Sequence, residues 1–299
     1  MSCPSFPGCA SSPLELTSIT GTAPQEDAYF VVELAKPWPA KIKKVEGLIS
    51  DLRSVLKGHK GEDVRLIATP EIPWGDTSLK PRGLLLRWSG TSSLCEEIEA
   101  SPEALKAALS APPSGQATPL YLVCTHGSRD PCCGLLGIPL YKTLSQASKR
   151  AVLQVSHLGG HRFAPVVATF PEWRIFGHLT AEIALRLDSA LAEGAPFLEG
   201  YRGHGQLSPQ LQVVEAALWE KFGADLLGVR QRAGDKRSLT VEAHLKDQPD
   251  RLYQAELDEF RYHGYKSCKD YRKGKPSELK LPRLKSLVSV TRETQGTVQ

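Results

Sequence analysis

The sequence predicts an α/β protein of several domains, and three observations support this prediction. The chain has 299 residues, about twice the size of a typical single domain. Apolar residues make up 41% of it and charged residues 23%, which is ordinary for a folded protein and excludes a disordered, collagenous or coiled-coil chain. Short apolar runs typical of strands alternate with segments of helical spacing along most of the sequence.

The first unit, residues 1–115, begins with an irregular lead-in rich in Ser, Pro, Gly and Thr. Ser101 and Pro102 supply the cap and the first-turn proline of its last helix. The run from Ala111 to Gly115 contains two prolines and ends the unit. The expected elements are a strand at 29–34, a helix at 44–56, strands at 64–68 and 84–88, and a helix at 102–108.

The second unit, residues 116–205, opens with an apolar run at 119–123 that predicts a strand buried on both faces. The order of its elements is β-α-β-β-β-α, in which a right-handed crossover is followed by a hairpin and a covering helix. This is the thioredoxin-like arrangement, and because the first unit is also α/β, the two units can be distant copies. The later elements are a helix at 139–149, strands at 151–155, 165–170 and 173–176, and a helix between Thr180 and Gly194.

The third unit, residues 206–299, is expected to hold a helix, short strands and a basic tail. Ser208 and Pro209 begin the helix, which runs to Phe222. The short strands are expected at 226–230, 239–245 and 252–257.

Charge is distributed unevenly along the chain. The net charge is only +4, so charge alone does not predict binding to nucleic acid. Between residues 261 and 285, however, nine Lys and Arg residues oppose only Asp270 and Glu278. This segment is either a docking face for a protein partner or a solvated tail without one.

The sequence also indicates a compartment. No apolar run approaches the roughly 18 residues of a membrane-spanning helix, and the first residues lack the basic flank and apolar stretch of a secretory signal. We therefore expect a cytoplasmic protein without a membrane span. Its seven cysteines should stay reduced there, which favours metal binding or redox work over a disulfide framework.

Two loops concentrate the reactive side chains. One runs from Cys124 to Cys133 and the other from His157 to Arg162, and both follow predicted strands at the edge where α/β sheets usually place their sites. If the two strands are parallel neighbours, the loops open on the same edge. Cys124, Cys133, His157 and His161 then form a Cys2His2 set.

Residue types alone leave several interpretations of this set open. Thiolate and imidazole suit both zinc and an iron–sulfur cluster. The His-x3-His spacing is typical of zinc, whereas the eight residues between the cysteines make a broad loop that suits a larger inorganic core. Buried cysteines and ordinary hydrogen-bonded histidines without any metal are the third interpretation. Gly159 and Gly160 argue against it, because they let the backbone curl so that both imidazoles can point inward.

The spacing of the residues argues against three other kinds of site. Cys124 and Arg129 are one residue too close for the phosphate loop of a cysteine phosphatase. A dithiol exchange site needs C-x-x-C, and the chain offers only the vicinal Cys132 and Cys133. A Rieske site pairs a Cys-x-His box, which Cys124 and His126 imitate, with a second box that contains cysteine. No cysteine accompanies His157 or His161.

The strings C-T-H-G-S-R-D-P-C-C, H-L-G-G-H-R-F-A and Y-R-G-H-G-Q-L-S-P-Q resemble those of the sucrase/ferredoxin-like family. The resemblance implies a thioredoxin-like ferredoxin domain and an electron carrier rather than a catalyst with its own substrate. It also implies a [2Fe–2S] cluster at Cys124, Cys133, His157 and His161. Histidine-ligated clusters have potentials of roughly −150 to +300 mV, above the approximately −400 mV of plant-type ferredoxins.

The alternatives to an electron carrier are a zinc-stabilised Cys2His2 binding module without redox role and a sugar hydrolase. The hydrolase would need two carboxylates placed across a glycosidic bond, which the sequence does not indicate. For the electron carrier we expect a protein redox partner, a reductase or an acceptor, docking on the basic face 261–285.

Supporting roles are less specific. Arg129 and Asp130 are expected as a pair that braces the first loop, as residues that supply N–H groups to cluster sulfides, or as a surface ion pair. Cys133 is preferred to Cys132 as ligand by the resemblance, and His126 and Arg162 are candidate donors around the site. The sequence assigns no role to four other cysteines, Cys3, Cys9, Cys95 and Cys268.

Overall fold

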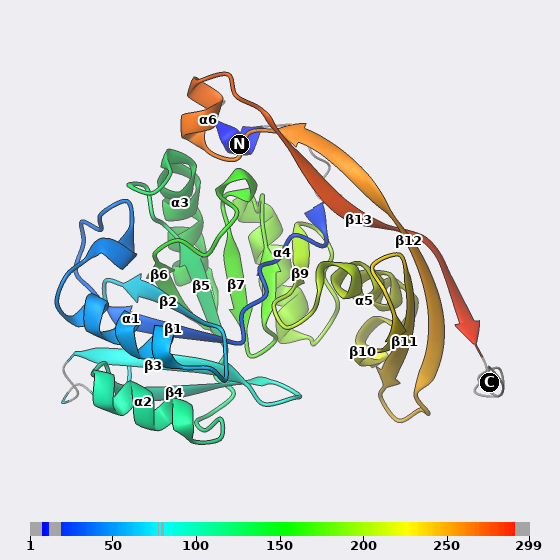
Figure 1. Ribbon diagram of the computed structural model, residues 1–299, viewed down its shortest axis with the longest axis horizontal. Coiled ribbons are helices and arrows are strands. Elements are labelled where there is room, and N and C mark those ends of the chain that lie inside the picture. The colour runs from blue at the N-terminus through cyan, green and yellow to red at the C-terminus, as the bar shows by residue number, and fades with distance from the viewer. Residues whose placement is uncertain (1–7, 12–18, 77, 79–80, 291–299) are drawn as a thin grey trace.

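The computed structural model describes residues 8–11, 19–76, 78 and 81–290, which form three sheets and their covering helices (Figure 1). The α/β class expected from the sequence is confirmed. Most of the lead-in, residues 1–7 and 12–18, lies outside the described residues. None of the helices in the described part of the chain is both long and apolar enough to cross a bilayer.

The N-terminal sheet has the strand order β2-β1-β3-β4, with β1 and β2 parallel and the other pairs antiparallel. Both of its helices pack on one face. Ser101 caps the second helix, as the sequence predicts, by accepting a hydrogen bond from the Ala104 N–H. The elements are β1 (Ala28–Glu33), α1 (Leu48–Gly58), β2 (Val64–Thr69), β3 (Arg82–Trp88), β4 (Ser93–Glu99) and α2 (Pro102–Ser110).

The central sheet repeats this plan and adds one strand. Its order is β6-β5-β7-β8-β9, with β5 and β6 parallel and the rest antiparallel. The elements are β5 (Leu120–Cys124), α3 (Pro131–Ala147), β6 (Ala151–Val155), β7 (Val167–Phe170), β8 (Arg174–Phe176), α4 (Ala181–Ala192) and β9 (Tyr201–His204). Both units therefore share the element order β-α-β-β-β-α and the same strand order, as distant copies would.

The two sheets pack with their helix-free faces together. Phe30 and Val32 of β1 face the helices α1 and α2, whereas Tyr29 points to the other side. There its ring meets Phe170 and Trp173 of the central unit at centroid distances of 5.9 and 5.5 Å. The result is a four-layered body, helices, sheet, sheet, helices, with one apolar core between the sheets.

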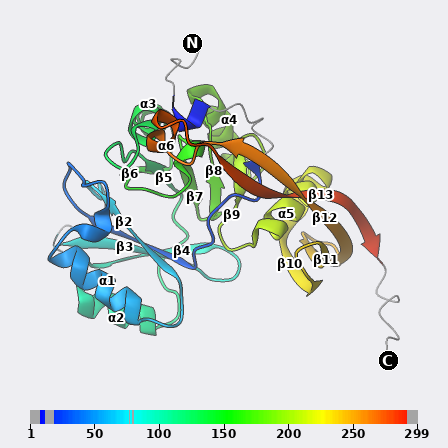
Figure 2. The same cartoon turned by 45° about the horizontal axis from the view of Figure 1, so that its top comes forward.

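The C-terminal sheet is an antiparallel meander in the order β10-β11-β12-β13, covered by α5. Its last two strands have 14 residues each and extend as a long arm toward the start of α3 (Figures 1 and 2). The short helix α6 forms the tip of this arm, beside the 3-10 turn η1 (Cys9–Ser11). The elements are α5 (Pro209–Phe222), β10 (Leu226–Gly234), β11 (Ser238–Leu245), β12 (Arg251–Gly264), α6 (Cys268–Arg272) and β13 (Ser277–Val290).

The structure corrects the expected elements in three places. Helix α3 begins at Pro131 instead of Pro139, because Asp130 caps it and Pro139 is accommodated inside it. The sequence analysis missed β4, β9, β13 and α6, whose patterns are too polar or too short to stand out. The segment 261–285 is the ordered tip of the arm, formed by β12, α6 and β13, and not a tail.

Candidate metal centre

The first loop joins β5 to α3 and carries both cysteines of the expected site. Cys124 is the last residue of β5, and Cys133 lies in the first turn of α3. Asp130 holds this turn, since its carboxylate accepts a hydrogen bond from the Cys132 N–H at 3.1 Å. Pro131 occupies the first helical position, where the missing N–H costs nothing.

Two glycines let α3 begin directly against the end of β5. A Cβ atom on Gly137 would overlap the carbonyl oxygen of Cys124, and one on Gly134 would lie 2.8 Å from the Cα atom of Gly127. Side chains at these positions would push the helix away from the strand. Glycine therefore allows the helix to bring Cys133 close to Cys124.

The second loop follows β6 and leads into the 3-10 turn η4 (His161–Phe163), so it carries both histidines. Gly159 and Gly160 have φ angles of 100° and 71°, in the left-handed region that glycine adopts without strain. Since β5 and β6 are parallel neighbours, the two loops do leave the same edge of the sheet.

Three of the four expected ligands meet at this edge. The Nδ1 atom of His157 lies 4.0 Å from the Sγ atom of Cys124 and 3.9 Å from that of Cys133. All three donor atoms lie within 4.8 Å of one another. Both thiols are 1% exposed, whereas His157 is half-buried.

His161 stacks on His157 and is not part of this three-atom group. The two imidazole rings are stacked, with centroids 4.8 Å apart and an interplanar angle of 27°. The Nδ1 atom of His161 is buried and has no hydrogen-bond partner among the described residues. A buried polar atom without a partner calls for an unseen one, such as a bound metal.

The electrostatics of the site suit metal binding. A hydrogen bond between the two thiols lowers the pKa of Cys124 well below its usual value and raises that of Cys133, so the first thiolate forms at Cys124. Burial, followed by the neighbouring His157, lowers the pKa of His161. A thiolate and a neutral imidazole are the forms in which these side chains bind metal.

The residues around the site differ from the expected supporting roles. Among the described residues no ion pair joins Arg129 to Asp130; Arg129 is exposed and Asp130 is buried. His126 turns away from the thiols, where its Nε2 atom lies 3.0 Å from the carbonyl oxygen of Pro39. Arg162 donates to the Ser277 hydroxyl of the arm at 3.3 Å. The thiol of Cys132 points away from Cys133 toward Cys9 and Cys268.

Arg202 is a residue of the site that the sequence analysis left without a role. It is 2% exposed, and its guanidinium donates to the carbonyl oxygens of Gly159 at 3.2 Å and Thr22 at 2.5 Å. It therefore fixes the backbone between the two histidines. The string Y-R-G-H-G was the signal, because a lone arginine within an otherwise buried strand needs a polar partner.

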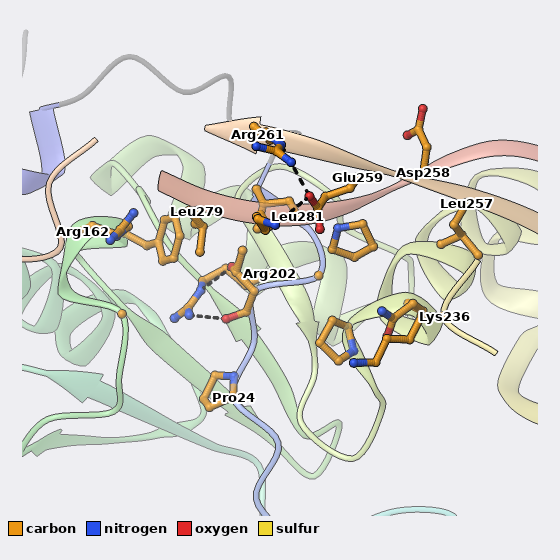
Figure 3. A pocket seen from close by; sticks show the side chains of 18 of the residues that line it. Pro24, Arg162, Arg202, Lys236, Leu257, Asp258, Glu259, Arg261, Leu279 and Leu281 are labelled. Carbon is orange, nitrogen blue, oxygen red and sulfur yellow. Dashed lines mark hydrogen bonds and ion pairs between the residues drawn. The ribbon is translucent and has the colours of Figure 1, made fainter. Parts of the chain in front are cut away.

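Figure 3 shows Arg202 beneath the arm, at the wall of a cavity of about 1100 Å³ between the second loop and the C-terminal sheet. His161 and Arg162 line the same cavity. One side of the second loop is therefore open, and its other side faces the buried thiols.

Both loops lie within a region that matches a known protein family. The family model described as sucrase/ferredoxin-like matches residues 19–203. A curated relative, "Altered inheritance of mitochondria protein 32" of Meyerozyma guilliermondii, is 31% identical over 99 residues, which cover 28% of this chain and 34% of that protein. The chain thus spans about a third of the length of this relative. No solved structure matches the chain. With both loops and most of the two α/β units inside the matched region, the chain belongs to the sucrase/ferredoxin-like family.

Proposed function

We propose that this protein carries one [2Fe–2S] cluster, bound by Cys124, Cys133, His157 and His161, and works as an electron carrier without a substrate of its own. The observation that carries the proposal is the pairing of two fully buried thiols with two stacked imidazoles at one sheet edge. The Nδ1 atom of His161 supports it, because that atom has no hydrogen-bond partner among the described residues and is left for a bound group.

Each ligand has a definable task. When bound, the cluster supplies reversible one-electron chemistry. The two thiols give up their protons to bind it, and their burial keeps water from the sulfur atoms. The two imidazoles bind as neutral groups, so the site carries two fewer negative charges than one built from four thiolates, which favours uptake of an electron. Arg202 keeps both imidazoles in place by holding the carbonyl of Gly159.

An acidic protein partner suits the surface next to His157. The half-buried His157 borders a groove of about 180 Å³ that is also lined by Lys41, Lys43 and Arg129. We propose that a redox partner docks over this groove and extends to the basic face 261–285, whose helix α6 lies beside the start of α3. Opposite charges across the interface would speed the encounter, and salt would slow it.

A zinc-stabilised module without redox role is the second candidate, and one observation favours it. The donor atoms of Cys124, Cys133 and His157 lie within 4.8 Å of one another, as compact as the shell of a single ion. In this alternative His161 would be the fourth ligand or a hydrogen-bonding neighbour of His157.

Iron and acid-labile sulfide analysis of anaerobically purified protein separates the two candidates. We expect a red-brown protein with about two iron and two sulfide per chain. Cys124→Ser and His157→Ala should each lose most of this iron. Cys95→Ser is the matched control, because Cys95 lies on β4 outside both groups of clustered cysteines, and it should keep the iron. A colourless wild-type protein with zinc at Cys124 and no sulfide would overturn the proposal.

A further inference from the structure

A second cluster of metal-ligating side chains lies on the far side of Cys132. Cys9, Asp130, Cys132 and Cys268 place one donor atom each within 4.8 Å of one another. All four are 3% exposed or less, and the three cysteines are free thiols. They come from the turn η1, the start of α3 and the tip of the arm, so the cluster joins segments up to 259 residues apart in sequence.

The distances suit one ion rather than several. The Sγ atom of Cys9 lies 3.7 Å from the Sγ atoms of Cys132 and Cys268 and 3.7 Å from the Oδ1 atom of Asp130. Sulfur ligands of one tetrahedral zinc, with bonds of about 2.3 Å, lie about 3.8 Å apart. The Sγ atoms of Cys132 and Cys268, at 3.0 Å, would separate slightly when the ion binds. Here all four donor atoms lie within 4.8 Å of one another, whereas at the proposed cluster site His161 lies outside the compact group.

The donor set selects zinc among the common metals. Three thiolates and a carboxylate are ligands that Zn²⁺ takes in a closed four-coordinate site, whereas Mg²⁺ and Ca²⁺ require oxygen shells. The carboxylate of Asp130 is already oriented, because it accepts hydrogen bonds from the N–H groups of Cys132 at 3.1 Å and Cys268 at 2.8 Å. Such outer hydrogen bonds are what ordered zinc ligands require.

The described residues offer little apolar packing that could hold the tip of the arm. Among the described residues, the buried cluster here contains only Ala164 besides the three cysteines, with Ala10, Leu136 and Tyr265 packed partly against it. So small an apolar core contributes little free energy, and small structures of this kind usually need a metal or a disulfide. One disulfide would use two of the three thiols and leave the third beside a buried carboxylate.

A buried cation offsets half of the charge that the cluster would carry. Arg162 is 8% exposed, its Nη1 atom has no partner among the described residues, and it interacts electrostatically with Cys9. Three thiolates, one carboxylate and Zn²⁺ would leave two negative charges, for which this guanidinium is the nearby counter-charge.

We propose that Cys9, Asp130, Cys132 and Cys268 bind a structural Zn²⁺, which replaces the three thiol protons and fastens η1 and the arm to the start of α3. This site is separate from the proposed cluster site and does not depend on it. It also adjoins that site, since the Cys9 thiol contacts the carbonyl oxygen of His161 at 3.7 Å and Cys132 precedes Cys133. The ion would therefore restrict the movement of both loops that carry the proposed cluster ligands.

The test is elemental analysis of the full chain, purified anaerobically from zinc-supplemented medium and passed over a weak chelator. We expect about one zinc per chain that resists the chelator. Cys9→Ser and Cys268→Ser should each release at least about nine-tenths of it, and Asp130→Asn should weaken zinc binding at least about tenfold. Asparagine is also a good cap, so Asp130→Asn tests the ligand without removing the start of α3. Cys95→Ser should keep its zinc.

Iron measured in the same samples distinguishes this proposal from the proposed function. Cys124→Ser should lose iron and keep zinc, whereas Cys268→Ser should lose zinc and keep most of its iron. Wild-type protein without tightly bound zinc, or zinc unchanged in Cys268→Ser, would refute the zinc site. A Cys132–Cys268 disulfide in the anaerobic protein, found by non-reducing mass spectrometry, would refute it too.

Cobalt substitution and hydrogen exchange cover the case in which a serine variant fails to fold. Co²⁺ added to metal-depleted Cys124→Ser, which lacks a ligand of the other site, should give the intense visible bands of a tetrahedral thiolate site, and Zn²⁺ should abolish them. Removing zinc should speed amide exchange in residues 251–290 more than in the N-terminal sheet. Octahedral Co²⁺ spectra, or equal amide exchange in both regions, would count against a zinc ion that fastens the arm to α3.

Discussion

Cys132 and Cys133 are neighbours in the chain, yet their thiols serve different places. Successive residues of a helix point about 100° apart, so at the start of α3 one thiol faces His157 and the other faces Cys9 and Cys268. The sequence analysis treated Cys132 as a competitor for one site. At the scale of single residues, the helical turn decides that both cysteines have partners.

His178 gives a prediction at the same scale. It lies behind the second loop, edge-on to Phe163, and burial, followed by the charge of Arg202, lowers its pKa to about 4. In the unfolded chain the imidazole of His178 takes up its proton near pH 6.5. Between these two values the unfolded state therefore holds more protons, and the free energy of unfolding should fall as the pH is lowered. The loss should reach about 3 kcal/mol near pH 4 and be absent above pH 6.5.

Denaturant unfolding of His178→Asn at a series of pH values checks this. Asparagine accepts the positive φ of 55° at this position, so the variant should keep the fold and lose part of the acid sensitivity. His263→Asn is the control, because the His263 side chain is 73% exposed, and its pH profile should follow the wild type. If the free energy of unfolding of His178→Asn fell with pH as steeply as that of the wild type, His178 would not be the source of the acid sensitivity.

At the scale of elements, the site depends on how closely α3 approaches β5. The helix starts at Pro131, directly after its cap Asp130, because the cap, a first-turn proline and two tightly packed glycines coincide there. The arm is the opposite case. β13 alternates charged and apolar residues and has little buried surface of its own, so it forms because it pairs with β12 along its whole length.

Gly137→Ala tests the approach of helix to strand. The new methyl group would overlap the carbonyl oxygen of Cys124, so we expect the free energy of unfolding to fall by about 1–3 kcal/mol, with a loss of bound metal at Cys124 and Cys133. Gly58→Ala, in the last turn of α1 with open space around it, should be neutral or more stable by up to about 1 kcal/mol. Circular dichroism in denaturant and metal analysis measure both. Equal free energies of unfolding for the two variants would show that the close contact between Gly137 and Cys124 does not limit stability.

At the scale of the whole molecule, two units of the same topology share one core. Tyr29 of the first unit packs on Phe170 and Trp173 of the second, and Ser156 after β6 donates its N–H to the carbonyl oxygen of Ala68 in β2. The proposed cluster ligands all come from the second unit, and the first unit covers the sheet that carries them. The family match ends at residue 203, so the C-terminal sheet and its arm lie outside it.

Trp173→Ala should weaken both units together. Trp173 is fully buried, and its ring contacts Phe170 at 5.0 Å and Tyr29 at 5.5 Å, so its loss should cost about 3–5 kcal/mol. Because the core is shared, unfolding followed by circular dichroism and by tryptophan fluorescence should stay coincident at a lower denaturant concentration. Phe260→Ala, on the exposed arm, should change stability little. Separate transitions for the two units would argue against a common core.

The sequence by itself determined what local patterns encode. Continuous apolar runs predicted that β1 and β5 are buried on both faces, and caps such as Ser101 marked where helices begin. The two loops with Cys124, Cys133, His157 and His161 could be recognised because each follows a strand end, and parallel strands bring such ends together. The family follows from the same strings, and the family match confirms it.

Only the tertiary structure decided what depends on distant partners. Cys9 and Cys268 have no local pattern, and their meeting with Asp130 and Cys132 follows from the path of the arm, which returns across the molecule to the start of α3. Arg202 likewise acts through Thr22 and Gly159, far from it in the chain. A sequence pattern reports the local environment that each residue needs, whereas contacts between remote segments arise from packing, which no local spacing encodes.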